Sequence, residues 1–199
     1  MSTARPAASR STRTCCAATG EDCTRARNDE NQVTERPSPG ENPPVAHWTV
    51  QPVPVGSAPA RALVRTYLAD IIGRYYGRPA VGAEVDQALA DDPTDDLVAF
   101  FVGRLDGRPL GCAGFRMVSS ETAELKRLFV HSEARGQGGG AALLAAVEEA
   151  AVSIGASSVR LDTRSDLVEA RKLYARHGYR EVAPFNDDRY AEHWFEKRL

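Results

Sequence analysis

Four glycines crowd the start of one apolar, periodic run of the chain. The stretch "VHSEARGQGGGAALLAAVEE", residues 130–149, contains Gly136 and then three consecutive glycines from Gly138 to Gly140. Each glycine in a helix costs about 1 kcal/mol relative to alanine. A helix that begins with so many glycines therefore needs a reason. The loop either turns the chain or lets a ligand approach the backbone closely.

Two of the three interpretations of this loop fit poorly. A merely flexible turn does not explain why a strand ends a few residues before the loop and an apolar helix starts directly after it. The segment from Gly136 to Ala141 also fits the G-x-G-x-x-A pattern of dinucleotide-binding proteins, with Asp162 at the end of the next strand. In that pattern the first glycine follows the strand almost directly, whereas residues 131–135 intervene here. The preceding strand is also too charged to be buried on both faces.

The third interpretation is an anion-binding loop. The first N–H groups of a helix have no partner within the helix, and together with the positive end of the helix dipole they bind phosphates. Arg135 adds a cation at the entrance. Because no Lys-Ser/Thr pair ends the loop, it is not a nucleoside triphosphate loop. The sequence therefore predicts a pyrophosphate held by backbone amides, with no metal required.

The first 46 residues differ in composition from the rest. Between Met1 and His47 there is no Leu, Ile, Phe, Tyr or Trp, so this segment cannot bury enough apolar surface to offset its ordering entropy. We expect a disordered extension over residues 1–46 and one folded domain over residues 47–199. A targeting role is the alternative, but the segment lacks the apolar region of a secretory signal and the apolar face of a transit helix.

Hydrophobic spacing predicts the elements of the domain. We expect helices over 58–77, 81–92, the run after the glycine loop, and 166–178, where Gly178 is a C-cap candidate. The helix after the loop carries an apolar face of Leu143, Leu144, Val147, Ala151 and Ile154. Strands are expected over 47–53, 123–130, 157–163, 179–185 and 193–199, with two more in 97–118 joined through Asp106-Gly107. This order predicts a mixed sheet in a single α/β domain.

Charge, hydropathy and cysteine usage exclude several classes of function. A net charge of -2 argues against binding nucleic acid by neutralising its phosphates. No apolar run approaches the roughly 20 residues needed to cross a bilayer. The cysteines, Cys15, Cys16, Cys23 and Cys112, have no zinc-site spacing and no nearby histidine pair, so no metal is expected. We expect a soluble, cytoplasmic protein with reduced thiols.

Several motifs together resemble the GCN5-related N-acetyltransferases. "RGQGGGA" resembles their Q/R-x-x-G-x-G/A signature, with Arg135, Gly138 and Gly140 at the defining positions. "AELKRLFVHSEARGQGGGAALL" is similar to their fourth strand and third helix, "ARKLYARHGYREV" to a later helix, and "HWFEKRL" to the closing strand. The likeness covers residues 48–199. It implies a mixed, mostly antiparallel sheet flanked by helices.

The resemblance also implies acetyl-CoA as the cosubstrate. The pyrophosphate would then lie on the amides of the loop and the pantetheine arm along the preceding strand. The implied binding residues are Leu128, Phe129, Val130, Arg135, Gly136, Gln137, Gly138, Gly139, Gly140 and Ala141. Two positions depart from the family pattern. Gly139 stands where an aliphatic residue is usual, which implies a looser helix start, and Leu167 stands where many members have Asn.

Two residues are candidates for proton transfer, because acetyl transfer needs a deprotonated amine and a protonated leaving thiolate. Glu124 is the candidate base: it lies eleven residues before Arg135, the spacing of the catalytic glutamate in the histone-acetylating branch that this stretch resembles. The alternative is a solvent-facing glutamate paired with Lys126 or Arg127. Tyr174 is the candidate acid, and the alternative is a core aromatic residue. Cys112 is expected in the core rather than as a nucleophile.

We therefore expect an N-acetyltransferase that moves an acetyl group to a primary amine of a small molecule by direct attack in a ternary complex. The alternatives are a non-catalytic acyl-CoA-binding sensor, or acetylation of a protein lysine or N-terminus. Asp187, Asp188 and Glu192 gather in the last loop and would steer a cationic acceptor, unless they form only a solvated turn. The acceptor's identity stays open, as does the formation of a homodimer.

Overall fold

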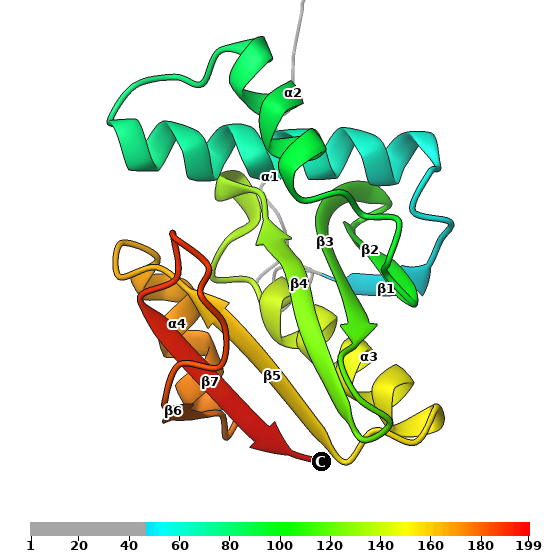
Figure 1. The fold of residues 1–199 in the computed structure, drawn as a ribbon. Coiled ribbons are helices and arrows are strands. Elements are labelled where there is room, and N and C mark those ends of the chain that lie inside the picture. The colour runs from blue at the N-terminus through cyan, green and yellow to red at the C-terminus, as the bar shows by residue number, and fades with distance from the viewer. Residues whose placement is uncertain (1–46) are drawn as a thin grey trace, which may run out of the picture. The chain divides into compact units, whose positions relative to one another are not determined.

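The computed structural model describes residues 47–199, so the expected disordered extension lies outside the described residues. These residues form a mixed sheet with helices on both faces (Figure 1). The elements in chain order are β1 (Trp48–Pro52), α1 (Ala58–Tyr76), α2 (Gly82–Asp91), β2 (Ala99–Leu105), β3 (Arg108–Met117), β4 (Thr122–Val130), a 3-10 turn (Ser132–Ala134), α3 (Gly139–Ser153), β5 (Ser158–Thr163), α4 (Val168–Arg176), β6 (Arg180–Val182) and β7 (His193–Arg198). This order confirms the predicted α/β domain.

The sheet is mostly antiparallel, as expected. Its strand order is β1-β2-β3-β4-β5-β7-β6, and of the strand pairs within it β4 with β5 is the parallel one. Asp106 and Gly107 both have positive φ, 48° and 82°, which is the backbone of a tight hairpin turn between β2 and β3. One predicted core position is wrong: Ile154 follows the last turn of α3 and is exposed.

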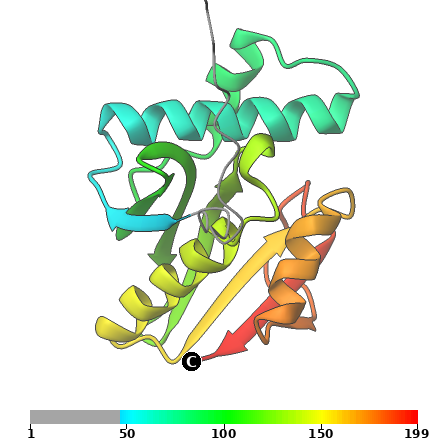
Figure 2. The same ribbon diagram turned by 180° about the vertical axis from the view of Figure 1, so that it is seen from behind.

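The helices divide between the two faces of the sheet (Figures 1 and 2). On one face Leu63, Val64 and Leu68 of α1 pack against Phe100 of β2 and Phe129 of β4, and α2 joins this layer. The other face carries the larger core, where α3 packs over the middle of the sheet and α4 beside it. Its buried residues include Phe115, Leu125, Leu143, Leu144, Val147, Leu161, Tyr174 and Phe195.

β4 and β5 pair only at their beginnings. The paired positions run from Thr122–Ser158 to Glu124–Arg160, although β4 continues to Val130 and β5 to Thr163. Beyond Glu124 the two neighbouring strands therefore separate, and the sheet opens between them. The edge of β5 away from this opening is paired with β7, which fixes the backbone of β5.

A bulge interrupts β4 within this opening. The register with β3 shifts between Cys112 and Gly114, and Arg127 has a φ of 59°. A bulge re-aims side chains that would otherwise alternate between the two faces. Here the side chains of the consecutive residues Lys126 and Arg127 both line a cavity that α1 and α2 border.

Candidate active site

A cavity of about 460 Å³ lies at the start of α3. It is bordered by the end of β4, the glycine loop, α4 and the middle of α1. Nine of the ten residues predicted to bind the cofactor line it: Leu128, Phe129, Val130, Arg135, Gly136, Gly138, Gly139, Gly140 and Ala141. Gln137 is the exception. Its side chain is exposed, and its amide Nε2 donates a hydrogen bond to the carbonyl of Glu133 at 3.2 Å.

The glycine loop has a backbone that suits an anion. Gly136 and Gly138 adopt φ values of 78° and 88°, which side-chain-bearing residues rarely adopt, and a Cβ at either position would meet only open space. The amide of Ala142 is bonded to the carbonyl of Gly138, so the amides before it lie ahead of the intrahelical ladder. Such free amides at a helix start fit a pyrophosphate.

Two cations that sequence reasoning missed also line this cavity. Lys172 and Arg176 belong to α4 and lie one turn apart on it. Their i, i+4 spacing could have shown that they share a face, but not that this face borders the glycine loop. With the free amides, they make the cavity suited to a phosphorylated ligand such as acetyl-CoA.

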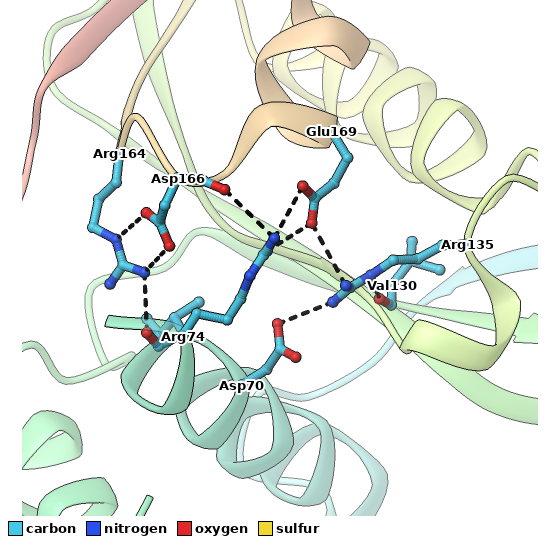
Figure 3. Close-up of polar contacts among 8 residues, drawn as sticks. Asp70, Arg74, Val130, Arg135, Arg164, Asp166 and Glu169 are labelled. Atoms are coloured by element: carbon cyan, nitrogen blue, oxygen red, sulfur yellow. Dashed lines mark hydrogen bonds and ion pairs between the residues drawn. The ribbon is translucent and has the colours of Figure 1, made fainter. Parts of the chain in front are cut away.

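Arg135 is held by the protein on three sides (Figure 3). Its Nε donates to the carbonyl of Val130 at 3.0 Å, and its Nη2 donates to Asp70 of α1 at 2.9 Å. Its Nη1 lies 3.5 Å from Glu169 of α4, which also binds Arg74 of α1 through both carboxylate oxygens. Arg135 thus links the glycine loop to α1 and α4. Its direct contact with a phosphate stays a prediction.

A second, larger cavity of about 930 Å³ lies on the α1–α2 side of the opening between β4 and β5. Its walls come from α1, α2, β4, β5, α4 and the loop from Asp187 to Tyr190. It adjoins the first cavity, because Tyr67, Ile71, Leu128, Leu167 and Ala170 line both. Leu167 therefore forms part of an apolar wall between the two spaces.

Tyr174 lines the larger cavity and is only 5% exposed. Its ring lies 5.8 Å from the rings of Tyr179 and Phe195, so it is also part of the core. Burial, with smaller contributions from Tyr67 and Asp162, raises the pKa of its hydroxyl well above the ordinary value. The group thus stays protonated at neutral pH. This is compatible with the predicted acid role, which stays a prediction.

Glu124 lies in a network of cations and is 1% exposed. Its Oε1 accepts a hydrogen bond of 2.6 Å from Arg116, and its Oε2 accepts one of 3.0 Å from Arg160. Lys126 Nζ lies 3.7 Å away, whereas Arg127 pairs with Asp92 instead. Burial alone would raise the pKa of Glu124, but Arg116, Lys126 and Arg160 together hold it below its ordinary value. The predicted base role stays a prediction, and these contacts weigh against it.

Asp162 is a carboxylate that sequence reasoning did not assign to catalysis. It lies two residues beyond the last paired position of β5 and lines the larger cavity. Asn186 Nδ2 donates to its Oδ1 at 3.1 Å, and Trp194 Nε1 in turn donates to Asn186 Oδ1 at 2.8 Å. Burial raises the pKa of Asp162. The charge of Lys126 and the hydrogen bond from Asn186 lower this pKa, whereas the charges of Asp188 and Glu124 raise it further. The pKa remains above its ordinary value.

Of the three acidic residues in the last loop, only two line the larger cavity. Asp187 and Asp188 line it, but Glu192 does not: its carboxylate accepts a hydrogen bond of 2.7 Å from the amide of Ser165. The expectation that Glu192 joins the entrance is therefore wrong, because this residue anchors the β5–α4 loop. Arg164 and Arg189 also line the cavity, so both signs of charge surround it.

Cys112 lies in the core, as expected. Its side chain is fully buried under α1, and burial raises the pKa of its thiol to about 12. A thiol with this pKa is not a nucleophile at neutral pH.

No helix within residues 47–199 is both long and apolar enough to cross a membrane.

The cavity formed by the end of β4 and the glycine-rich start of α3 is the arrangement that the sequence resemblance implies for an acyl-CoA-dependent transferase. The chain belongs to the acetyltransferase (GNAT) family, whose sequence model matches residues 65–179. In the solved PaiA N-acetyltransferase of Thermoplasma acidophilum in complex with coenzyme A, the fold is similar: the TM-score is 0.60 at 15% identity, and the match covers 77% of this chain and 99% of that one.

Two curated relatives are similar in sequence. The N-acetylaspartate synthetase of Homo sapiens is 35% identical over 138 residues, which are 63% of this chain and 46% of that protein. The IAA acetyltransferase of Azospirillum brasilense is 32% identical over 89 residues, 44% of this chain and 58% of that protein. The matches thus span about half the length of these relatives.

Proposed function

We propose that this protein transfers the acetyl group of acetyl-CoA to a primary amine of a small molecule, by direct attack while both are bound. One observation carries the proposal: the cavity beside the glycine loop and the larger cavity share a wall of five residues. A thioester bound along β4 and an amine bound between α1, α2 and β5 would meet at that wall. Holding two reactants in contact replaces a bimolecular encounter and lowers the barrier.

The chain's own residues supply the binding of acetyl-CoA. The free amides of the glycine loop, Lys172 and Arg176 would hold its phosphates, and Leu128 to Val130 would border its pantetheine arm. Acetyl-CoA supplies an activated carbonyl carbon. Tyr174 supports the proposal because it is a protonated phenol at the larger cavity, and it would give a proton to the leaving sulfur.

The names of the relatives support a small-molecule acceptor. One is named for the synthesis of N-acetylaspartate and the other as an IAA acetyltransferase. The cavity of about 930 Å³ can enclose a metabolite of that size. Since Arg164 and Arg189 lie on the cavity with Asp187 and Asp188, its charges suit an acceptor that carries an anionic group as well as the amine.

A thiol-release assay tests the proposal. The full chain is incubated with acetyl-CoA and a panel of primary amines that includes amino acids, amino sugars, alkylamines, arylamines and lysine-bearing peptides. We expect thiol release that depends on a small amine, with the N-acetylated product identified by mass spectrometry. Turnover on the peptides alone would indicate a protein acceptor. Tight binding of acetyl-CoA without turnover on any amine would indicate a non-catalytic sensor.

A further inference from the structure

We propose that Asp162 is the base that takes the proton from the acceptor's ammonium group. The proposal rests on the proposed function, since it needs an amine in the larger cavity. It assigns to Asp162 the role that the sequence pattern gave to Glu124. Four observations carry it, and they concern the position of Asp162, its open oxygen, its neighbours and the engagement of Glu124.

The position of Asp162 follows from the sheet. β4 and β5 stop pairing after Glu124 and Arg160, and Asp162 lies two residues further along β5. Side chains two residues apart point to the same face of a strand, so Asp162 shares the face of Arg160, which contacts Glu124. The backbone of Asp162 is held opposite Trp194 on β7. Its side chain thus lies on this face of the sheet, beside the opening between the strands and at the wall of the larger cavity.

Asp162 keeps one carboxylate oxygen for a ligand. Within the described part of the chain its side chain accepts one hydrogen bond, from Asn186 Nδ2 onto Oδ1. Trp194 orients that amide by donating to Asn186 Oδ1, which fixes Nδ2 as the atom that faces Asp162. This relay holds the carboxylate in one orientation. It leaves Oδ2 as the atom that can accept a proton from a ligand.

The charged and titratable groups around Asp162 come from each element packed against it. Lys126 and Glu124 lie on β4 and Asp188 on the last loop, and their charges act on Asp162. Burial is the main cause of the raised pKa of the hydroxyls of Tyr67 on α1 and Tyr174 on α4, and the charge of Asp162 adds to it. Asp162 lines the same cavity as the predicted acid Tyr174 and as the five residues of the wall that both cavities share.

Glu124 has no carboxylate oxygen that is open to a ligand. Both of its oxygens accept hydrogen bonds from arginines, and it does not line the larger cavity. Protonating it would leave Arg116 and Arg160 without their buried counter-ion. A base works best when its pKa lies near the working pH. The pKa of Asp162 is raised toward that range, and the pKa of Glu124 is lowered away from it.

An ammonium N–H bond breaks, its electron pair stays on nitrogen, and the proton bonds to Asp162 Oδ2, from which solvent later removes it. The free amine then forms the C–N bond with the thioester carbon while the C–S bond breaks. Tyr174 protonates the departing thiolate and regains a proton from the same nitrogen. One acetyl group is transferred and one proton is released for each turnover.

Asp162→Asn tests the assignment, with Glu149→Gln as the control that removes one exposed carboxylate from α3. The assay uses acetyl-CoA with two amines from the panel: an alkylamine, which is charged at neutral pH, and an arylamine, which is uncharged there. For the alkylamine we expect kcat to fall about 10²- to 10⁴-fold. For the uncharged amine, which needs no base, we expect a loss below about tenfold. Equal losses with both amines, or a rise in KM without loss of kcat, would overturn the proposal.

The pH dependence of kcat/KM is a second test of the role of Asp162. The base must be ionised to act, so kcat/KM of the wild type should fall as the pH drops through the pKa of Asp162. Asn186→Ala removes a hydrogen bond that lowers this pKa, so it should move the acid limb to higher pH. An unmoved limb in the folded variant would overturn the proposal. If Asp162→Asn fails to fold, this variant decides the matter.

A third measurement separates this proposal from the proposed function. Carboxyl carbon NMR of the wild type follows the titration of Asp162 without any acceptor, with the resonance assigned by its loss in Asp162→Asn. An ordinary aspartate pKa would overturn the base assignment even if the amines are acetylated. Failure of every amine, with a raised pKa at Asp162, would instead contradict the proposed function.

Discussion

The indole ring of Trp48 lies directly against the backbone of Gly139, the first residue of α3. A methyl group on Gly139 would be 2.3 Å from Cζ2 of Trp48, far inside van der Waals contact. The ring comes from β1, so this contact seats the start of α3 against the edge of the sheet. The departure from the family pattern at Gly139 is thus a close packing site, and the expectation of a loose helix start is wrong.

Gly139→Ala should destabilise the domain. The rigid indole cannot move without disturbing β1, and overpacking of this kind costs about 1–3 kcal/mol. Gly82→Ala is the matched control, because Gly82 is the first residue of α2 and a Cβ there meets nothing within 4 Å. Chemical denaturation of both variants would measure the difference. If Gly139→Ala proved as stable as Gly82→Ala, the tight contact would not exist in solution.

Gly138→Glu should abolish binding of acetyl-CoA. The glutamate places a negative charge at the amides that are proposed to hold the pyrophosphate. Each lost hydrogen bond to a charged group costs about 1.5–3 kcal/mol, or roughly tenfold or more in affinity. Gly155→Glu is the control, since Gly155 follows the other end of α3 and also has a positive φ, 97°. Calorimetry should show binding to the control alone, and unchanged affinity in the folded Gly138→Glu variant would refute the phosphate site.

Tyr174→Phe should lower kcat about 100-fold or more, because the thiolate would leave without its acid. Affinity for acetyl-CoA should change little, since Tyr174 lines the larger cavity and not the one at the glycine loop. Steady-state rates with the best amine of the panel, together with calorimetry, measure both quantities. Full turnover in this variant would show that Tyr174 is not the acid and serves only as a core residue.

Glu124→Gln should destabilise the domain by about 2 kcal/mol, because it weakens the charged hydrogen bonds from Arg116 and Arg160. Asp96→Asn is the control: Asp96 binds the same Arg116 but is half exposed, so its loss should cost less than about 1 kcal/mol. Urea denaturation at neutral pH measures both variants. Equal costs would show that the burial of Glu124 adds nothing to the network.

The same residue predicts how stability depends on pH. The pKa of Glu124 is lower in the folded protein than its ordinary value of 4.5. Its contribution is therefore fully present above that value and is lost as the pH falls through the folded-state pKa. The Tm of the wild type should drop in this acidic window, and that of Glu124→Gln should drop less. Parallel curves would mean that Glu124 does not cause the acid sensitivity.

The parts of the fold that the sequence predicts are those with local causes. Neighbouring residues determine both the hairpin turn at Asp106-Gly107 and the glycine loop before α3. The backbone confirms both predictions. The placement of β7 between β5 and β6 depends on pairing with β5, from which α4 and β6 separate it in the sequence, so no local pattern reveals it. The insertion of the last strand is what brings Trp194, and with it Asn186, to Asp162.

In the candidate site too, the sequence predicts what neighbouring residues determine and misses what depends on residues far apart in the chain. The residues of the cavity at the glycine loop that the sequence motif predicts lie in one continuous stretch, from Leu128 to Ala141, whereas the α1 and α4 residues that complete the cavity lie far from it in sequence. The larger cavity draws on α1, α2, β4, β5, α4 and the last loop, and its charges depend on which pairs form in three dimensions. Spacing alone could not show that Arg116 and Arg160 engage Glu124, or that Asp162 keeps an open oxygen.

Direct transfer requires that acetyl-CoA and the amine are bound together at the shared wall. Initial rates, measured while acetyl-CoA and the best amine are varied against each other, test this most directly. We expect double-reciprocal lines that intersect, because both substrates must be bound before any product leaves. Parallel lines, with release of coenzyme A and a stable acetyl-protein before the amine is added, would contradict it.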